Sequence, residues 1–306
     1  MKTIQWFPGH MTKAMRMMQE NLSLVDGIIF VLDARCPAAS FNPKLKKMAN
    51  NKPVLYVLNK GDLADGRADA LLNIIRKKGA EAVKINAVNS NSRRDIAAAV
   101  EKLVAEKRAK ALEKGYMRTF RFMVAGVPNT GKSTLINLLA GSRRAEVGDK
   151  AGVTRGKQWI RCESFELLDT PGTMPPAFEN QYLAAHLAFV GSINDDILDM
   201  DDIVLLLLEE LSEKYPERLK ERYGIDVGTP VDLSCGSSSS SVIKKPGCGA
   251  TPLEMLDTVC EKRGFKLRGN EYDYERAIRA VVDDFRKGKL GKITLDVPAD
   301  FEGLEF

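Results

Sequence analysis

The chain has 306 residues, of which 44% are hydrophobic and 28% charged. This composition is typical of globular proteins, and the length fits two domains. The five cysteines show no CxxC spacing, which argues against a disulfide framework and against a zinc site with paired ligands. No apolar run reaches the roughly 18 residues that span a bilayer, and the first residues lack a signal core. We therefore expect a cytoplasmic protein that does not bind membranes. We also expect a monomer.

The net charge of +5 conceals an uneven distribution. Residues 1–178 carry 30 basic and 16 acidic residues (+14), whereas residues 179–306 carry 16 and 25 (−9). A strongly basic half favours an anionic partner, and RNA is the obvious one. A solvated basic surface without a partner is the alternative that charge alone leaves open.

Short apolar runs alternate with helical patterns through the first half of the chain, as in buried parallel strands joined by helices. Strands are expected at residues 27–34, 53–58, 82–85, 120–125, 157–162 and 165–168, and helices at 42–49, 67–78 and 93–114. Six strands with interleaved helices predict an α/β sheet that is covered on both faces.

The pattern changes after the Pro175-Pro176 pair. Helical patterns without strand runs follow at residues 179–223, 252–263 and 272–287. Residues 234–251 are rich in Ser and Gly, and they are expected to be mobile because they offer little apolar surface to bury. We therefore predict an α/β domain at 1–178 and a smaller all-α domain at 179–306.

The strongest motif is residues 126–133 (GVPNTGKS), which fits G-x-x-x-x-G-K-[ST] between a strand and an apolar helix. Its glycines let backbone N–H groups surround a β-phosphate. Lys132 is placed to reach the β- and γ-phosphates, and Ser133 to ligate Mg²⁺. The nucleotide contacts expected from this loop are Pro128, Asn129, Thr130, Gly131, Lys132, Ser133 and Thr134.

Residues 59–62 (NKGD) end the second predicted strand and indicate which base is bound. The Asp62 carboxylate can accept both N1–H and the 2-amino group of guanine, whereas adenine offers neither and would leave a buried charge unpaired. The other contacts expected on the base come from Asn59 at N7, from Lys60 along the ring face, and from Asn86 and Ala87 after the third strand, with the Ala87 N–H donating to guanine O6.

Residues 169–172 (DTPG) follow the last predicted strand. Asp169 is expected to hold Mg²⁺ through a water, and the Gly172 N–H to contact the γ-phosphate. Thr154 lies between glycines in a segment before this motif, where a switch threonine would complete the Mg²⁺ shell when GTP is bound. Ser133, Thr154 and Asp169 are thus the expected Mg²⁺ ligands.

The order of these motifs is unusual. Ras-like GTPases have the phosphate loop first and the guanine motifs last, whereas here 59–62 and 86–87 precede 126–133. A circular permutation explains this order without changing the site, since chain termini can move to an exposed loop. The fold class predicted is therefore a circularly permuted Ras-like P-loop GTPase domain followed by a smaller all-α domain. In this order, the segment after Gly172 leads directly into the second domain.

The sequence resembles the circularly permuted ribosome biogenesis GTPase A family of bacteria over nearly its whole length. The matching residues are 6–11 (WFPGHM), 32–37 (LDARCP), 59–62, 126–134, 169–172 and 284–291 (DFRKGKLG). The resemblance implies a GTPase that is slow alone, is stimulated by ribosomal particles, and binds the large (50S) subunit late in its assembly. Thr173 departs from the hydrophobic residue usual in the family, and 234–251 looks like an insertion.

GTP hydrolysis needs a group that orients the attacking water, and Thr173 is too short to replace the glutamine of Ras-like enzymes. In the resembled family, the position of His10 is assigned a catalytic role. A structural histidine or an RNA contact is the alternative for His10, which is expected in a flexible loop. Lys132, Thr154 and His10 are the expected catalytic residues.

Asn129 suggests a second cofactor. In having asparagine at this position, the chain resembles GTPases that bind K⁺ near the α- and γ-phosphates. A monovalent cation there would supply positive charge to the transition state where no arginine finger is present.

Residues 262–292 hold ten basic and five acidic residues within the acidic half. An rRNA-contacting face is one interpretation, and a solvated helix face is the other. The residues that share helical spacing, and that we expect to contact RNA, are Arg276, Arg279, Arg286 and Lys289.

Two other functions compete with an assembly GTPase. One is a permuted GTPase with a zinc knuckle or an OB domain, which the cysteine spacing and the early start of the Trp6 motif disfavour. The other is a non-catalytic, GTP-gated RNA-binding module. Turnover that ribosomal particles accelerate would distinguish an assembly GTPase from the non-catalytic binding module.

Overall fold

The structure is a computed structural model that describes residues 4, 9–49, 52–141, 159–175, 178, 180–227 and 250–306. Its contacts divide the chain into two compact units. One unit contains a sheet and comprises Lys2–Asp196 together with Lys292–Phe306, and the other is Ile197–Gly291. Within the described part of the chain, no helix is long and apolar enough to cross a membrane.

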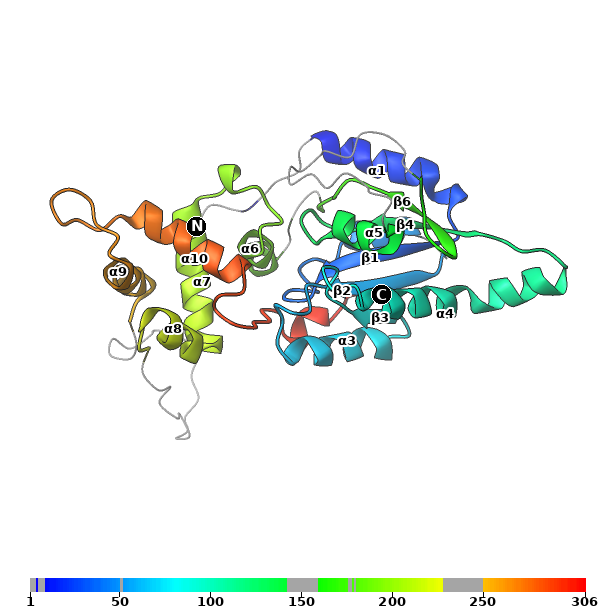
Figure 1. Cartoon of the computed structure of the whole chain (residues 1–306). Helices are drawn as coiled ribbons and strands as arrows, with labels where there is room; N and C mark the ends of the chain where they lie inside the picture. Colours follow the sequence, from blue (N-terminus) through cyan, green and yellow to red (C-terminus); the bar gives the residue numbers. More distant parts are fainter. Residues whose placement is uncertain are drawn as a thin grey trace, which may run out of the picture. The chain divides into compact units, whose positions relative to one another are not determined.

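The sheet unit has six strands in the order β3-β2-β1-β4-β6-β5 (Figure 1). All neighbouring pairs are parallel except β5 with β6. The strands are β1 (Gly27–Asp33), β2 (Val54–Asn59), β3 (Glu81–Lys84), β4 (Phe120–Ala125), β5 (Trp159–Arg161) and β6 (Phe165–Asp169). The predicted α/β sheet is confirmed, and the strand bounds agree with the sequence within one or two residues. The structure adds that the edge strand β5 is antiparallel to β6.

Both faces of the sheet are covered, which explains the nearly continuous apolar runs of the central strands. Every residue of β1 and β2 is buried. One face packs against α1, α2, α3 and the short helix η3, and the other packs against α4 and α5. The bounds are α1 (Gly9–Asn21), α2 (Pro43–Ala49), α3 (Arg67–Lys77), α4 (Ser92–Glu113), α5 (Lys132–Ala140) and η3 (Pro298–Phe301).

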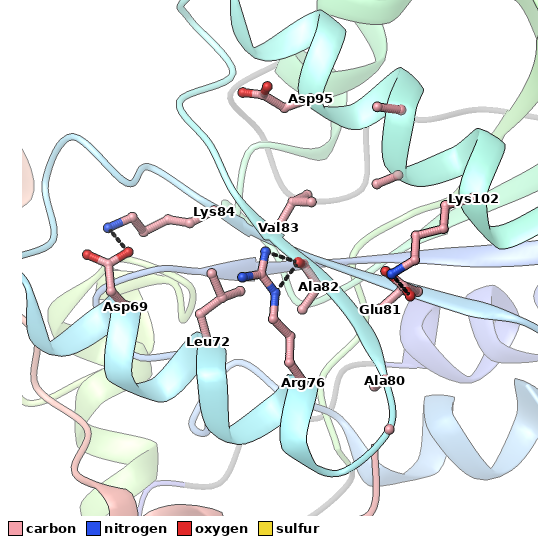
Figure 2. A pocket seen from close by; sticks show the side chains of 13 residues that line it. Asp69, Leu72, Arg76, Ala80, Glu81, Ala82, Val83, Lys84, Asp95 and Lys102 are labelled. Atoms are coloured by element: carbon pink, nitrogen blue, oxygen red, sulfur yellow. Dashed lines mark hydrogen bonds and ion pairs between the residues drawn. The ribbon is translucent and has the colours of Figure 1, made fainter.

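Strand β3 forms one edge of the sheet and lines a groove of about 910 Å³ with α3 and α4. Figure 2 shows how charged side chains cover this edge: the Arg76 guanidinium donates to the Ala82 carbonyl, and ion pairs join Lys84 to Asp69 and Lys102 to Glu81. Such charged cover blunts an edge strand against pairing with another chain. None of the residues that line the groove belongs to the nucleotide motifs.

The described residues of the second unit are mostly helical, with one isolated antiparallel bridge between Lys266 and Tyr272. It contains α7 (Met200–Lys214), α8 (Pro216–Tyr223), α9 (Pro252–Arg263) and α10 (Tyr274–Arg286). Thr251 begins α9 with a reciprocal capping box to Glu254, and Gly264 ends it at a positive φ. Most of the Ser/Gly-rich segment 234–251 lies outside the described residues.

The division between the units differs from the boundary expected at residues 178 and 179. Helix α6 (Gln181–Phe189) and residues 292–306 belong to the sheet unit. Phe301 explains part of this difference, because its buried ring belongs to the apolar core on the α1–α3 face of the sheet. The helical unit is therefore inserted into the sheet unit, and the chain connects the two units twice.

The N-terminal segment also differs from the expectation of a flexible loop. Helix α1 begins at Gly9 and includes His10. Met11, Ala14 and Met18 are buried along one side of this helix, with a spacing that fits helical periodicity. Burial of this apolar stripe is the physical reason that the segment is helical.

Candidate active site

The nucleotide motifs meet at one edge of the sheet because the strands that carry them are parallel. Strands β1, β2, β4 and β6 all end at this edge, and each is followed by a motif or ends in one. The carboxyl edge of a parallel sheet is where such folds bind ligands. Spatial assembly thus restores a single site from motifs whose order along the chain is permuted.

The phosphate loop requires glycine at two positions. Gly126 has φ +152°, and a Cβ there would lie 2.4 Å from the Val31 carbonyl oxygen. Gly131 has φ +89°, and a Cβ there would lie 2.3 Å from Nδ2 of Asn59. The loop leads into the N-terminus of α5, whose free N–H groups and helix dipole favour an anion.

Lys132 is buried within this loop, and its Nζ donates to the Val127 carbonyl at 2.8 Å. Burial lowers the pKa of Lys132 to about 8, with the Asp169 carboxylate opposing the shift and Lys60 adding to it. Close packing continues at Gly172, where a Cβ would lie 3.0 Å from the Lys132 ammonium. The lysine and Gly172 therefore face the same small space.

Asp169 and Ser133 fit a divalent cation. Among the described residues, Oδ1 of Asp169 is buried without a hydrogen-bond partner. Burial raises the pKa of this carboxyl group, although the charge of Lys132 opposes the shift. Ser133 is the second residue of α5 and supplies a hydroxyl oxygen. Oxygen donors of this kind suit Mg²⁺, whereas Thr154 lies outside the described residues.

Asn59 links the phosphate loop to the base-binding loops. Its Nδ2 donates to the Thr130 carbonyl at 2.8 Å, and its Oδ1 accepts the Ala87 N–H at 2.9 Å. The sequence predicts a contact with guanine N7 but not this brace. In this structure the Ala87 N–H, expected to meet guanine O6, donates to Asn59 instead. The neighbouring Asn86 accepts the Val88 N–H through its side chain.

A buried carboxylate holds the lysine of the guanine motif. Oδ2 of Asp33 lies 2.8 Å from the Lys60 Nζ, and both carboxylate oxygens of Asp33 accept from Arg35 at 2.9 and 2.8 Å. Burial alone would raise the pKa of Asp33, but the charges of Arg35 and Lys60 outweigh it and hold that pKa well below the usual range. Sequence analysis assigned no role to Asp33 beyond the family motif.

Asp62 is exposed in the turn after β2, and Lys60 has the unusual φ of +60°. A positive φ at a non-glycine residue often marks a functional site. Burial lowers the pKa of the Arg35 guanidinium. The charge of Asp33 and, to a smaller extent, the charge of Asp62 raise this pKa, and the net shift is upward. The Asp62 carboxylate therefore lies within the electrostatic reach of the Asp33–Arg35 pair.

Asn129 connects the phosphate loop to α6. It is exposed, has φ +58°, and donates from Nδ2 to the Gly191 carbonyl at 2.6 Å. The Asn129 contact uses an N–H of the amide and leaves the Oδ1 atom as the atom that a cation such as K⁺ could use. The partner Gly191 lies just beyond α6, so the sequence gave no local signal for it.

Thr173, which is expected not to orient water, and His10, which is expected to be catalytic, differ in how much of each the structure describes. Thr173 is fully buried, and its backbone N–H donates to the Gly126 carbonyl at 3.1 Å. Burial of this side chain agrees with the interpretation that it does not orient water. His10 is described only as a backbone position of α1, because its side chain lies outside the described residues.

The basic residues expected to contact RNA do not form one unengaged helix face. Arg276 stacks over the Phe265 ring, with 4.7 Å between its guanidinium carbon and the ring centroid. Arg279 pairs with Glu275 on the same helix, and Arg286 is partly exposed at the end of α10. Lys289 lies beyond α10 and contacts the Asp284 carboxylate at 3.0 Å.

Asp284 gathers two further cations that sequence analysis missed. Arg222 from α8 and Arg263 from α9 approach its Oδ2 at 2.8 and 2.9 Å. The carboxylate is 5% exposed, whereas the Arg222, Arg263 and Lys289 side chains are 30%, 33% and 46% exposed. Three half-exposed cations from separate elements thus surround one buried anion. We call this group the Asp284 cluster.

Fold and site together define a P-loop GTPase with permuted motifs: a parallel sheet, a glycine phosphate loop at a helix N-terminus, and a guanine motif braced against that loop. The chain belongs to the ribosome biogenesis GTPase A family, as its similarity to known members shows. It is 40% identical to ribosome biogenesis GTPase A from Bacillus cereus, over 97% of this chain and 95% of that protein. The same protein from Priestia megaterium is 38% identical, over 98% and 99%.

Two further comparisons agree with this family. The model of the 50S ribosome-binding GTPase family matches residues 121–228. A GDP-bound structure of TM YlqF superposes with a TM-score of 0.61 and covers 93% of this chain and 100% of that chain. At 24% identity, this structural likeness supports the fold alone.

The Asp33 network predicts a pH-dependent loss of stability. Asp33→Asn removes the charge that compensates buried Arg35, and breaking a buried ion pair costs about 3–5 kcal/mol of unfolding free energy near neutral pH. Because the folded state depresses the pKa of Asp33, its stabilisation is present above the unfolded value of 3.8 and is lost as the pH falls further.

Denaturant unfolding of the wild type and of Asp33→Asn between pH 7 and pH 3 measures this effect. The difference in unfolding free energy should be largest near neutral pH and shrink below about pH 4. A difference that is constant with pH would contradict a charged role for Asp33. Glu20→Gln, which removes an exposed carboxylate paired with Arg16, is the matched control.

Proposed function

We propose that the chain is a GTP-hydrolysing switch that acts in the cytoplasm, as a monomer, during late assembly of the large (50S) ribosomal subunit. The observation that carries the proposal is the braced guanine-nucleotide site in a chain that matches ribosome biogenesis GTPase A over 97% of its length. GTP and GDP are its nucleotides, and rRNA of the 50S particle is its proposed partner.

In this proposal, each part of GTP meets one part of the site. The N-terminus of α5 and Lys132 bind the β- and γ-phosphates, and the Gly172 N–H contacts the γ-phosphate. Asp62 accepts from guanine N1–H and the 2-amino group, while Lys60 lies along the base. Hydrolysis then depends on orienting water and on stabilising charge in the transition state.

Ser133, Thr154 and Asp169 would hold Mg²⁺, which neutralises charge that develops on the phosphates. Asn129 would hold K⁺ through Oδ1, while its Nδ2 keeps the bond to Gly191. Buried Thr173 supplies no water-orienting group, which leaves His10 at the start of α1 as the proposed catalytic residue. The His10 imidazole would act as a general base by accepting a hydrogen bond from the attacking water.

The chain connections suggest how hydrolysis reaches the second unit. Helix α6 follows the 169–172 motif, and Gly191, just beyond its end, accepts a hydrogen bond from Asn129 in the phosphate loop. The helical unit begins a few residues later, at Ile197. Contacts to the γ-phosphate therefore act on the segment that leads into this unit, and we propose that GTP favours simultaneous contact of both units with the particle.

Affinity for ribosomal particles in different nucleotide states tests this proposal. The protein should sediment with 50S particles, and not with 30S, more strongly with a non-hydrolysable GTP analogue than with GDP. By linkage, 50S particles should raise the affinity for the GTP analogue by the same factor. Equal affinities in the two states would contradict a switch, and turnover that 50S particles fail to accelerate would favour a non-catalytic binding module.

We further propose that rRNA contacts the Asp284 cluster, in addition to Arg276, Arg279 and Arg286. Part of the charge on Arg222 and Arg263 offsets the negative ends of the helices that they terminate. Their side chains remain 30% and 33% exposed while the buried Asp284 carboxylate holds them in place. Cations held in this way match the phosphodiester backbone, which dominates the affinity of proteins for nucleic acids.

A pair of double variants tests the cluster. Arg263→Gln with Lys289→Gln should weaken binding to 50S particles about tenfold. The slope of log affinity against log salt concentration should become shallower by roughly 1.5, because two phosphate contacts are lost. Arg276→Gln with Arg279→Gln removes the same charge from α10 and should have a smaller effect. If only the α10 pair weakens binding, the cluster does not contact RNA. GDP affinity of the free protein is the control for folding.

A further inference from the structure

Residues 293–296 return from the helical unit and cross the loops that precede and follow the guanine motif. We call them the C-terminal strap. They are buried, yet they form no helix or strand. The Ile293 N–H donates to the Leu63 carbonyl at 2.9 Å, and the Leu295 N–H donates to the Arg35 carbonyl at 2.7 Å. Backbone bonds therefore attach the strap to two loops that are remote in the sequence.

Thr294 adds a side-chain bond to the first of these loops. Its Oγ1 accepts the Asp65 N–H at 3.2 Å. Together with the Ile293–Leu63 bond, this contact fixes the turn just after Asp62, the exposed carboxylate that is proposed to recognise guanine. A buried hydroxyl that accepts a backbone N–H sets the path of a loop, because leaving that N–H unpaired is costly.

Asp296 holds the second loop. Its Oδ2 accepts the N–H groups of Ala38 and Ala39 at 2.6 and 3.1 Å, and its Oδ1 lies 2.7 Å from Nδ1 of His186 on α6. Both the carboxylate and the imidazole are fully buried. The Nδ1 atom of His186 thus has a buried acidic partner on a helix whose neighbouring residues are apolar.

The two loops converge on the base subsite. Arg35 begins the loop that Asp296 holds, and its guanidinium is bound to Asp33, which also binds Lys60. The charge of Asp62 acts on the same guanidinium. A shift of either loop would therefore move the lysine or the carboxylate that faces the base.

We propose that Thr294 and Asp296 are positioning residues for guanine recognition. The strap makes the segment that returns from the helical unit a structural part of the base subsite. The inference rests on the proposed placement of guanine at Asp62 and names residues that no nucleotide motif contains. A purely structural strap would affect folding alone, whereas a positioning strap also affects which base is preferred.

Inosine nucleotides separate these roles, because hypoxanthine lacks the 2-amino group. A well-placed Asp62 carboxylate gains two hydrogen bonds from guanine and one from hypoxanthine. If the loop is loosened, the second bond weakens and the preference for GTP over ITP falls. Thermal stability can fall in either case, but the affinity ratio changes only if the strap positions the carboxylate.

The experiment measures the affinities of GDP, GTP and ITP for the full chain and for two variants, Thr294→Val and Asp296→Asn. Asp296→Asn should weaken GDP and GTP equally, by about tenfold, and lower the GTP:ITP affinity ratio by at least about threefold. Thr294→Val keeps the side-chain shape and should lower the ratio about twofold. Asp300→Asn is the matched control, because Asp300 accepts the Val297 N–H in the turn that follows the strap.

An unchanged GTP:ITP ratio in both variants would overturn the inference, even if their melting temperatures fall. Asp62→Asn distinguishes this failure from failure of the base assignment. That variant should shift preference from GTP towards XTP, because xanthine presents an acceptor where guanine presents the amine. If Asp62→Asn changes the nucleotide preference while both strap variants keep the wild-type preference, guanine binds at Asp62 and the strap does not position the Asp62 carboxylate.

Discussion

The buried side chain of Asn59 joins parts of the site that lie far apart along the chain. Thr130, which accepts from its Nδ2, is 71 residues away, and Ala87, which donates to its Oδ1, is 28 residues away. Without Asn59, both backbone groups would lose a partner in a place closed to water, at a cost of about 1–3 kcal/mol each. The phosphate loop and the base-binding loops therefore depend on one amide for their relative position.

This constraint explains how a permuted chain keeps the site of a Ras-like GTPase. Parallel strands bring their carboxyl ends to one edge in any order of connection, and side-chain bonds across that edge fix the loops. The permutation also changes what the site is attached to. The chain leaves the sheet unit a few residues after Gly191, which contacts Asn129, and returns through a strap that contacts Leu63 and Arg35. Both connections of the helical unit thus begin at nucleotide loops.

The sequence predicted the features that depend on local patterns. Apolar runs located β1 and β2 because these strands are buried on both faces, and the phosphate loop was recognisable because its glycines are sterically required. Helix α1 was missed although its buried methionines have helical spacing, since the glycine beside His10 favoured a loop. The brace made by Asn59, the ion pair of Asp33 with Lys60 and the strap gave no such signal, because these contacts involve partners distant in sequence. Site contacts at Thr154 and the His10 side chain stay predictions.

Binding of Mg²⁺-tripolyphosphate, which has no base, tests the brace most directly. If Asn59 positions the phosphate loop, Asn59→Ala should weaken tripolyphosphate binding about tenfold or more, as well as GTP binding. Among the described residues, Asp62 makes no hydrogen bond to Thr130. Asp62→Ala should therefore weaken GTP binding and leave tripolyphosphate binding unchanged. If both variants bind tripolyphosphate as the wild type does, Asn59 acts only on the base, and the two subsites are not braced by it.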